Sequence, residues 1–493
     1  MIKNIKWLLL VSLTFVACND DEIVTYDTAD GLPLTAGTAD FSKYVALGDS
    51  FAAGFSDSAL FIEGQKGAYP NILAQQFALV GGGTFTTPLM ADNTGGLLLG
   101  GNVVQGVRLY FNGAAPVPVA GVPTTEITNK LTGNFNNMGV PGAKSFHLLA
   151  PGYGNAAGVA AGLASPYFSR FSSSATTTVL ADAISQNPTF FSLWIGGNDV
   201  LGYALTGGDG TNPITPTATF SGAYNTIASQ LSTGGRKGVI ANIPYVTSLP
   251  HFTTVPYNPV PLDAATVAQL NSAAAYGAYN AGIAQAFAYL VANNLMTQAN
   301  ADAEKARRTI TFRAGAGNAV VIMDEYLTNL TGINPALVSM RQATTEDLIV
   351  LPASAFIGTT VGGNPQAING VSVPLADKWV LSKNEIAELK TATDAYNGII
   401  QAAAATNNLA IVYADELMKK LATTGITANN YTLNATFATG GAFSLDGFHP
   451  TPRGYALIAN EFLKAINTKY GPNLKGVNLG NYRILFPRDA ANF

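Results

Sequence analysis

The chain has 493 residues, and only 11% of them are charged, well below the usual quarter. A net charge of −4 provides no basic field that could gather phosphates, so we expect no nucleic-acid partner. The hydrophobic share of 48% is enough for a large core, in two or three average domains or in one domain with long insertions.

Residues 1–18 have the features of an export signal. Lys3 and Lys6 precede an apolar run, Trp7 to Val16, that is too short to span a bilayer. The run ends in Phe15-Val16-Ala17-Cys18, which resembles the lipobox of bacterial lipoproteins, where the cysteine is lipidated and becomes the mature N-terminus. Phe15 departs from the usual Leu. The alternative is an ordinary cleaved signal peptide in which Cys18 is not lipidated.

Cys18 is the only cysteine, so it cannot form an intramolecular disulfide. The acidic tract of residues 19–22 resembles the surface-export signal of Bacteroidetes lipoproteins, although a solvated linker has the same composition. We therefore expect an exported protein that a lipid anchors in the outer membrane, with exposure at the cell surface left open.

Residues 19–42 lack periodicity and predict a flexible tether, with order beginning near Lys43. Residues 43–472 alternate compact apolar runs with helical patterns, which indicates a three-layer αβα domain around a mainly parallel five-stranded sheet. Residues 473–493 form a C-terminal extension. The predicted strands are Tyr44–Leu47, Phe135–Met138, Thr189–Ile195, Gly238–Ile243 and Leu409–Tyr413. The predicted helices are Tyr69–Val80, Thr176–Ser185, Thr219–Leu231, Ala264–Asn293, Lys383–Ala405 and Pro452–Thr468.

Four segments do not fit a minimal core of this class and are predicted to be insertions at the sheet ends, where substrate specificity is usually determined. They are residues 81–130, 150–175, 204–216 and 305–380. Within them, β-like pieces are Val103–Phe111, Thr309–Phe312, Val320–Met323 and Leu348–Leu351.

Ser50 follows the first predicted strand, in the run Gly48-Asp49-Ser50. A serine becomes a nucleophile when a base takes its proton and a carboxylate orients the base. Asp446-Gly447-Phe448-His449 supplies such a pair directly before the predicted helix at 452–468. Taken alone, Ser50 is equally well explained as a turn or helix-capping residue.

Acyl transfer by serine also needs hydrogen-bond donors for the oxyanion that forms on the attacked carbonyl. Two polar turns follow predicted strands. In the first, Gly142 can bring a backbone N–H close to a substrate, and in the second, Gly196-Gly197-Asn198-Asp199, Asn198 can offer its side-chain amide. Asp49 and Asp199 are interpreted as acceptors that brace the loops.

These motifs, in this order, resemble the SGNH hydrolases, the GDSL-type esterase and lipase family. The match covers about Lys43 to Tyr470. The resemblance implies a flavodoxin-like SGNH fold, with Ser50 as nucleophile, His449 as base and Asp446 as its orienting acid. It also implies an oxyanion hole formed by the N–H groups of Ser50 and Gly142 and by the Asn198 side chain. Family cores are much shorter than this chain, so the pocket built by the insertions does not carry over.

The resemblance thus implies a carboxylic ester hydrolase without metal or organic cofactor, acting as a monomer on a small-molecule or polymeric ester. Lipid acyl esters and acetylated glycans both remain open as substrates. Two alternatives are an acyltransferase that uses the same triad and a surface binding module that has kept a hydrolase fold.

The remaining polar motifs are interpreted as structural. His147 is expected in the core or a pocket wall, and His251 in a loop. Three scattered histidines do not make a zinc site. The loop Gly207-Gly208-Asp209-Gly210 fits a calcium turn but is interpreted as flexible. The pairs Asp324-Glu325 and Glu346-Asp347 are expected to be solvated.

Overall fold

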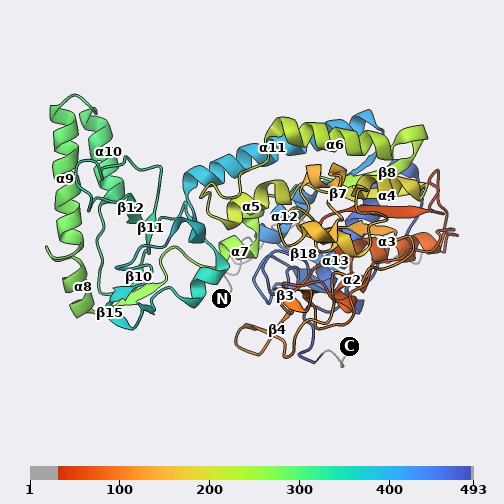
Figure 1. Cartoon of the computed structure of the whole chain (residues 1–493), viewed down its shortest axis with the longest axis horizontal. Coiled ribbons are helices and arrows are strands. Elements are labelled where there is room, and N and C mark those ends of the chain that lie inside the picture. Colours follow the sequence, from red (N-terminus) through yellow and green to blue (C-terminus); the bar gives the residue numbers. More distant parts are fainter. Residues whose placement is uncertain (1–30, 490–493) are drawn as a thin grey trace, which may run out of the picture.

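A computed structural model describes residues 31–489, and its centre is a five-stranded sheet in which all strands are parallel (Figure 1). The strand order β6-β1-β7-β8-β17 corresponds to 2-1-3-4-5 along the chain, an order of doubly wound sheets. Each strand overlaps one that the sequence predicts, which confirms the mixed α/β class. The strands are β1 (Tyr44–Gly48), β6 (Asn137–Gly139), β7 (Phe190–Trp194), β8 (Lys237–Ala241) and β17 (Ala410–Val412).

Helices cover both faces of the sheet, since β1 and β7 are buried along their whole length. On one face α3 (Tyr69–Ala78) packs against α13 (Pro452–Tyr470), and on the other α6 (Thr217–Leu231) packs against α11 (Lys383–Thr406). The sequence signals at the start of α13 are confirmed, because the Thr451 side chain accepts the Gly454 N–H and Pro452 opens the helix. The other helices of this body are α1 (Ser50–Ala53), α2 (Ile62–Lys66), α4 (Val179–Ser185), α5 (Asn198–Leu205), α7 (Pro250–Thr253) and α12 (Ala414–Thr423).

Short antiparallel hairpins lie outside the central sheet of this main body. The predicted run Val103–Phe111 is divided between two of them, because residues 106–108 leave the extended ladder. The hairpin strands are β2 (Leu97–Leu99), β3 (Asn102–Gln105), β4 (Leu109–Phe111), β5 (Pro116–Pro118), β18 (Ile426–Ala428) and β19 (Tyr431–Leu433).

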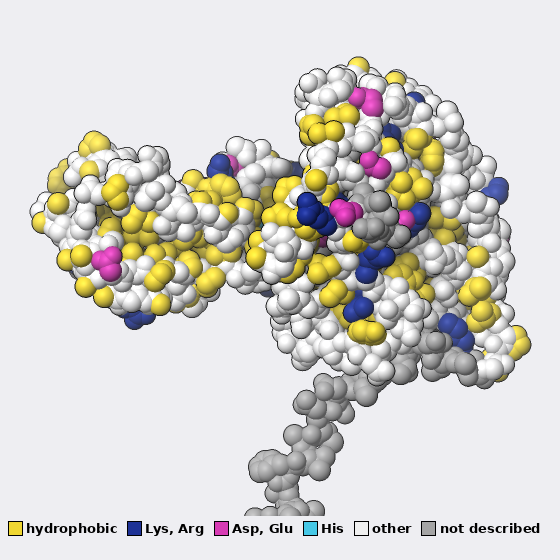
Figure 2. Space-filling model, turned by 90° about the horizontal axis from the view of Figure 1, so that it is seen from below, with side chains coloured by type: hydrophobic (Ala, Val, Ile, Leu, Met, Phe, Trp, Pro, Cys, Tyr) yellow, Lys and Arg dark blue, Asp and Glu magenta, His cyan; other side chains and the backbone are white. Residues whose placement is uncertain are grey.

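The segment between α7 and α11 projects from the body as an arm, which we define as residues 255–381 (Figure 1). Figure 2 shows the arm as a separate lobe with many hydrophobic and few charged side chains on the visible face. Its helices are α8 (Ala264–Leu270), α9 (Tyr276–Ala292) and α10 (Gln298–Arg308). Its strands are β9 (Val260–Leu262), β10 (Gly315–Asn318), β11 (Val321–Met323), β12 (Met340–Gln342), β13 (Leu348–Ile349), β14 (Thr360–Val361), β15 (Asn364–Ile368) and β16 (Val380–Leu381).

Three expectations for the arm are wrong. The predicted single helix Ala264–Asn293 breaks after Leu270, where the Asn271 side chain turns away to bond both the N–H and the carbonyl of Phe312. Those same bonds occupy the Thr309–Phe312 segment, which is therefore not a strand. The acidic pairs are not both solvated: Asp324 and Asp347 are buried and bind Arg341 at 2.5 and 2.7 Å.

Most of the described stretch of the predicted tether, residues 31–42, is exposed, but its last part contacts the body, which the prediction did not include. Phe41 is buried and stacks on Phe77, and Thr38 donates its N–H to the carbonyl of Tyr470 at 2.9 Å. Order therefore begins before Lys43, because an aromatic residue within the polar stretch reaches the core. Cys18 and the predicted export signal lie outside the described residues. Within residues 31–489, no helix combines the length and the apolar character needed to cross a bilayer.

Candidate active site

Three predicted site residues follow three neighbouring strands of the sheet. Ser50 opens α1 directly after β1, Gly142 follows β6, and Asn198 opens α5 after β7. Because parallel strands end at one edge, these residues share the rim where the strand order reverses, the usual ligand site of such sheets. A Cβ on Gly139, at the end of β6, would lie 2.3 Å from the Ala53 nitrogen, so glycine is required for α1 to rest on this rim.

His449 connects Ser50 to Asp446, across almost the whole chain. His449 Nε2 lies 2.9 Å from Ser50 Oγ, and His449 Nδ1 lies 2.8 Å from Asp446 Oδ2. The nucleophile, the base and the acid predicted from the sequence are therefore in hydrogen-bonding contact. This geometry allows His449 to take the Ser50 proton while Asp446 fixes the imidazole orientation.

Asp446 is held as an anion. Burial would raise its pKa, but the charge and hydrogen bonds of His449 and the backbone N–H of Phe448 outweigh burial and hold the pKa well below its usual range. Its Oδ1 accepts the N–H groups of Phe448 and His449, both at 2.9 Å, and the Ser444 hydroxyl at 3.0 Å. A carboxylate with so many donors is fixed in orientation and stabilises a neighbouring imidazolium.

A clamp that sequence reasoning missed holds the loop of Asp446 in place. The Ser58 N–H donates to Asp446 Oδ2 at 3.0 Å, and Asp57 Oδ1 accepts the Leu445 N–H at 2.9 Å. Burial is the main cause that raises the pKa of Asp57 to about 7. Asp57 and Ser58 both have positive φ, and no sequence motif predicts this turn.

Besides the Ser50 N–H, two of the predicted oxyanion donors lie on braced loops. Gly142 is exposed, and its N–H has no protein acceptor among residues 31–489. Asn198 Nδ2 donates to the carbonyl of Ala143 at 3.0 Å, which commits one of its two amide hydrogens and leaves the other. The expected bracing role of Asp199 fits its contacts, because it accepts two hydrogen bonds from Ser145, on the Gly142 loop.

Asp49 precedes the nucleophile and is buried. Its Oδ1 accepts the Phe51 N–H at 3.0 Å and caps α1. Burial raises its pKa to about 7, with the Phe51 N–H acting in the opposite direction. These contacts make Asp49 a brace for the turn that presents Ser50.

The other two histidines lie apart from Ser50. His251 is buried, stacks on Phe448 with ring centres 4.0 Å apart, and has its pKa lowered to about 4 by burial. His147 stacks on Tyr153 and accepts the Lys144 N–H at 3.0 Å, and burial lowers its pKa to about 4. Both are neutral packing residues at ordinary pH, and His251 lies in a short helix, α7, where a loop was expected.

Aromatic side chains surround the reactive pair. The rings of Phe55 and Phe51 lie 4.6 and 5.6 Å from the His449 ring, and Trp194 packs on Phe51 at 4.9 Å. Phe51 and Trp194 also line a small apolar cavity of about 40 Å³. The surroundings of Ser50 and His449 are therefore largely apolar on this side.

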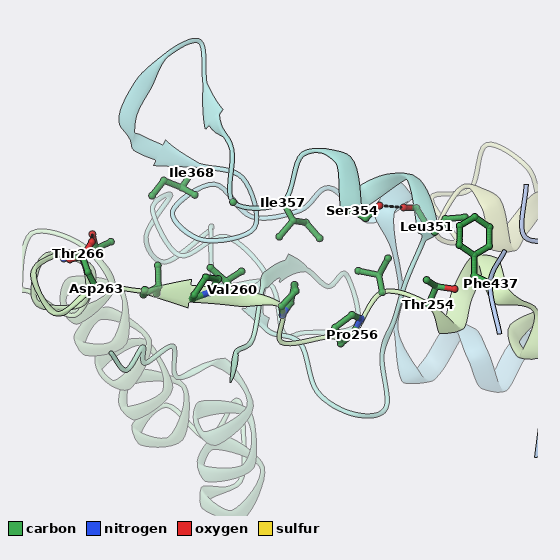
Figure 3. Close-up of a pocket in the computed structure, with 15 residues that line it drawn as sticks. Thr254, Pro256, Val260, Asp263, Thr266, Leu351, Ser354, Ile357, Ile368 and Phe437 are labelled. Carbon is green, nitrogen blue, oxygen red and sulfur yellow. Dashed lines mark hydrogen bonds between the residues drawn. The ribbon is translucent and has the colours of Figure 1, made fainter. Parts of the chain in front are cut away.

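A cavity of about 670 Å³ lies elsewhere, at the base of the arm (Figure 3). Pro256 and Val260 line it from the segment that enters the arm, Ile357 and Ile368 from the arm's later part, and Phe437 from the body. No triad residue lines it. Helix α7 lies between the cavity and the site: its His251 packs on Phe448, and its end meets the cavity at Thr254.

Comparisons with family models, with curated proteins and with solved structures return no match.

Proposed function

We propose that this chain is a serine hydrolase of the SGNH type that cleaves carboxylic esters through an acyl-enzyme on Ser50. The observation that carries the proposal is the hydrogen-bonded chain from Ser50 Oγ through His449 to Asp446, with distances of 2.9 and 2.8 Å. The place of Ser50 at the reversal point of the sheet supports it.

In the first half of the proposed reaction, Ser50 Oγ attacks the ester carbonyl while His449 Nε2 takes its proton. The carbonyl oxygen becomes an oxyanion, which the N–H groups of Ser50 and Gly142 and the free amide hydrogen of Asn198 stabilise. Collapse of this intermediate breaks the bond to the alcohol, and His449 returns the proton to the leaving oxygen. The acyl group remains on Ser50.

In the second half, water replaces the alcohol. His449 takes a proton from the water as its oxygen attacks the acyl-enzyme carbonyl, and the second oxyanion occupies the same donors. Breaking the bond to Ser50 Oγ releases the acid, and the proton on His449 restores the serine hydroxyl. Asp446 stays ionised throughout and stabilises the imidazolium.

Hydrolysis of nitrophenyl esters of increasing acyl length, beside acetylated glycans, tests this proposal. Ser50→Ala and His449→Ala are each expected to lower kcat by at least about 10⁴-fold, and Asp446→Asn by about 10³–10⁴-fold, with unchanged circular dichroism. A folded Ser50→Ala variant that keeps its activity would overturn the mechanism. Products formed with a competing alcohol separate hydrolysis from transfer of the acyl group.

We also propose export and lipid anchoring through Cys18, on the sequence pattern alone. Cys18→Ala is expected to release the protein from the membrane fraction. Full retention of this variant in membranes would contradict the proposed lipid anchor at Cys18. It would leave the proposed catalytic mechanism unaffected.

A further inference from the structure

Three carboxylates from different elements meet where the arm joins the body. Glu325 lies in the turn after β11, Asp377 in a 3-10 turn (Asp377–Trp379), and Glu385 in the first turn of α11. One carboxylate oxygen of each lies within 4.8 Å of the others. The motifs at the active site do not involve this group.

No ion pair joins any of the three to a lysine or arginine within residues 31–489. Of the basic side chains on neighbouring elements, Arg341 binds Asp324 and Asp347, Arg307 binds Glu304 and Asp324, and Lys383 binds Glu346. The group therefore has no basic side chain paired with it in this part of the chain.

Glu385 supplies a second and separate observation. Its side chain is 1% exposed, and its Oε2 is held by the Ser382 N–H at 2.5 Å as part of the cap of α11. Its Oε1 is buried, receives no hydrogen bond from any donor in residues 31–489, and lies close to the Glu325 carboxyl. Buried polar atoms almost always have a partner, and a carboxylate oxygen without one carries a large desolvation cost. This oxygen can therefore accept a ligand that approaches from the acidic group.

The turn at Gly207 and Gly208 closes over this oxygen. A Cβ on Gly208 would lie 2.6 Å from Glu385 Oε1, and a Cβ on Gly207 would lie 2.0 Å from the carbonyl oxygen of Asp377. Both glycines have positive φ, at 60° and 73°, which other residues rarely adopt. The glycine-rich loop is thus shaped to the acidic group and is not merely a flexible connection.

We propose that Glu325, Asp377 and Glu385 bind a calcium ion that fastens the base of the arm to α11 and to the turn after α5. Calcium takes six to eight oxygen ligands at about 2.3–2.6 Å, so opposite ligands are roughly 4.6–5.2 Å apart, and the three carboxylates fit this span. Glu325 is exposed, which leaves room for water to complete the coordination. Magnesium demands shorter bonds and a nearly ideal octahedron, so it fits less well.

Calorimetric titration of chelator-treated protein with calcium chloride tests the site. One ion is expected to bind per chain, with affinity at least about tenfold weaker in Glu385→Gln and Asp377→Asn. Glu346→Gln is the matched control, because Glu346 is a nearby exposed acid paired with Lys383 outside the group. Magnesium chloride is expected to bind at least about tenfold more weakly than calcium, and equal binding of both ions would overturn the assignment to calcium.

Thermal unfolding separates a bound ion from carboxyl groups that only share protons. Calcium is expected to raise the Tm of the parent by several degrees, reversibly with a chelator, because the ion binds the folded state only. In chelator, Glu385→Gln is expected to be at least as stable as the parent, because it removes one crowded charge, and to show no response to calcium. A parent chain that neither binds calcium nor changes its Tm at about 1 mM calcium refutes the proposal.

Discussion

Ser145 donates two hydrogen bonds to Asp199, from its N–H to Oδ2 and from its hydroxyl to Oδ1, both at 2.8 Å. This pair joins the loop that carries Gly142 to the helix that begins at Asn198. The segments that carry two of the proposed oxyanion donors, Gly142 and Asn198, are therefore joined by one buried carboxylate.

Asp199→Ala is expected to lower kcat by about 10–100-fold with little change in KM. The substitution leaves the Ser145 N–H buried without an acceptor, and a shift of the loop misplaces the donors. Asp182→Ala is the matched control, since Asp182 accepts the N–H and hydroxyl of Ser173 in the same way on α4. Equal losses of kcat in both variants would show a general effect on stability instead.

Asn198→Ala is expected to lower kcat by about 10²–10³-fold, the usual loss for one oxyanion donor. Because the amide also bonds the Ala143 carbonyl, some stability is lost as well. Kinetics with a short nitrophenyl ester, alongside the Tm, measure the two effects. An unchanged kcat would remove Asn198 from the oxyanion hole.

Replacing His449 and His251 separately with phenylalanine distinguishes the proposed base, His449, from the packing residue, His251. His251→Phe preserves the stack on Phe448 and is expected to keep kcat within about threefold. His449→Phe removes the contact with Ser50 Oγ and is expected to abolish turnover. Comparable losses in the two variants would contradict the assignment of His449 as the only base.

Stability is expected to fall as the pH rises from about 4 to about 7, in part because of Asp57. A carboxyl whose folded pKa is raised to about 7 binds its proton more tightly in the folded state, so it favours folding at low pH and opposes it above pH 7. Three pKa units correspond to at most about 4 kcal/mol. Asp446 acts oppositely, since its lowered pKa gives stability that is lost only as the pH falls below about 4.

Asp57→Asn is accordingly expected to flatten the decline in unfolding free energy between pH 4 and 7 and to be more stable than the parent at pH 8. Denaturant titrations at several pH values measure this slope. Identical slopes in the two proteins would mean that Asp57 does not titrate in this range.

The sequence predicted the parts of the site that follow from strand ends. Ser50, Gly142 and Asn198 each lie in the turn that follows a strand, and parallel strands end at one edge, so their meeting needs no knowledge of side-chain packing. The clamp of Asp57 and Ser58 could not be predicted, because it forms with Ser444 and Asp446, which lie 387 and 388 residues away.

The elements of the arm were likewise only partly predictable from the sequence. Helical periodicity alone gave one helix through Asn271, but that side chain binds the backbone of Phe312, 41 residues further on, and the helix ends. Likewise, the burial of Asp324 depends on Arg341, which follows it at no recognisable spacing. Pairings of this kind depend on tertiary contacts, which local patterns do not record.

Ser50, the proposed nucleophile, and His449, its proposed base, are separated by 399 residues, with the arm and the edge strand β17 between them. A nascent chain on the ribosome thus contains Ser50 long before it contains His449. Under the proposed mechanism, Ser50 has no neighbouring base until synthesis is nearly complete, and the partly made chain is expected to be inert. Separated fragments cut anywhere between the two residues are expected to be equally inactive, so ester turnover by a sample is expected to report how much of it is whole and folded.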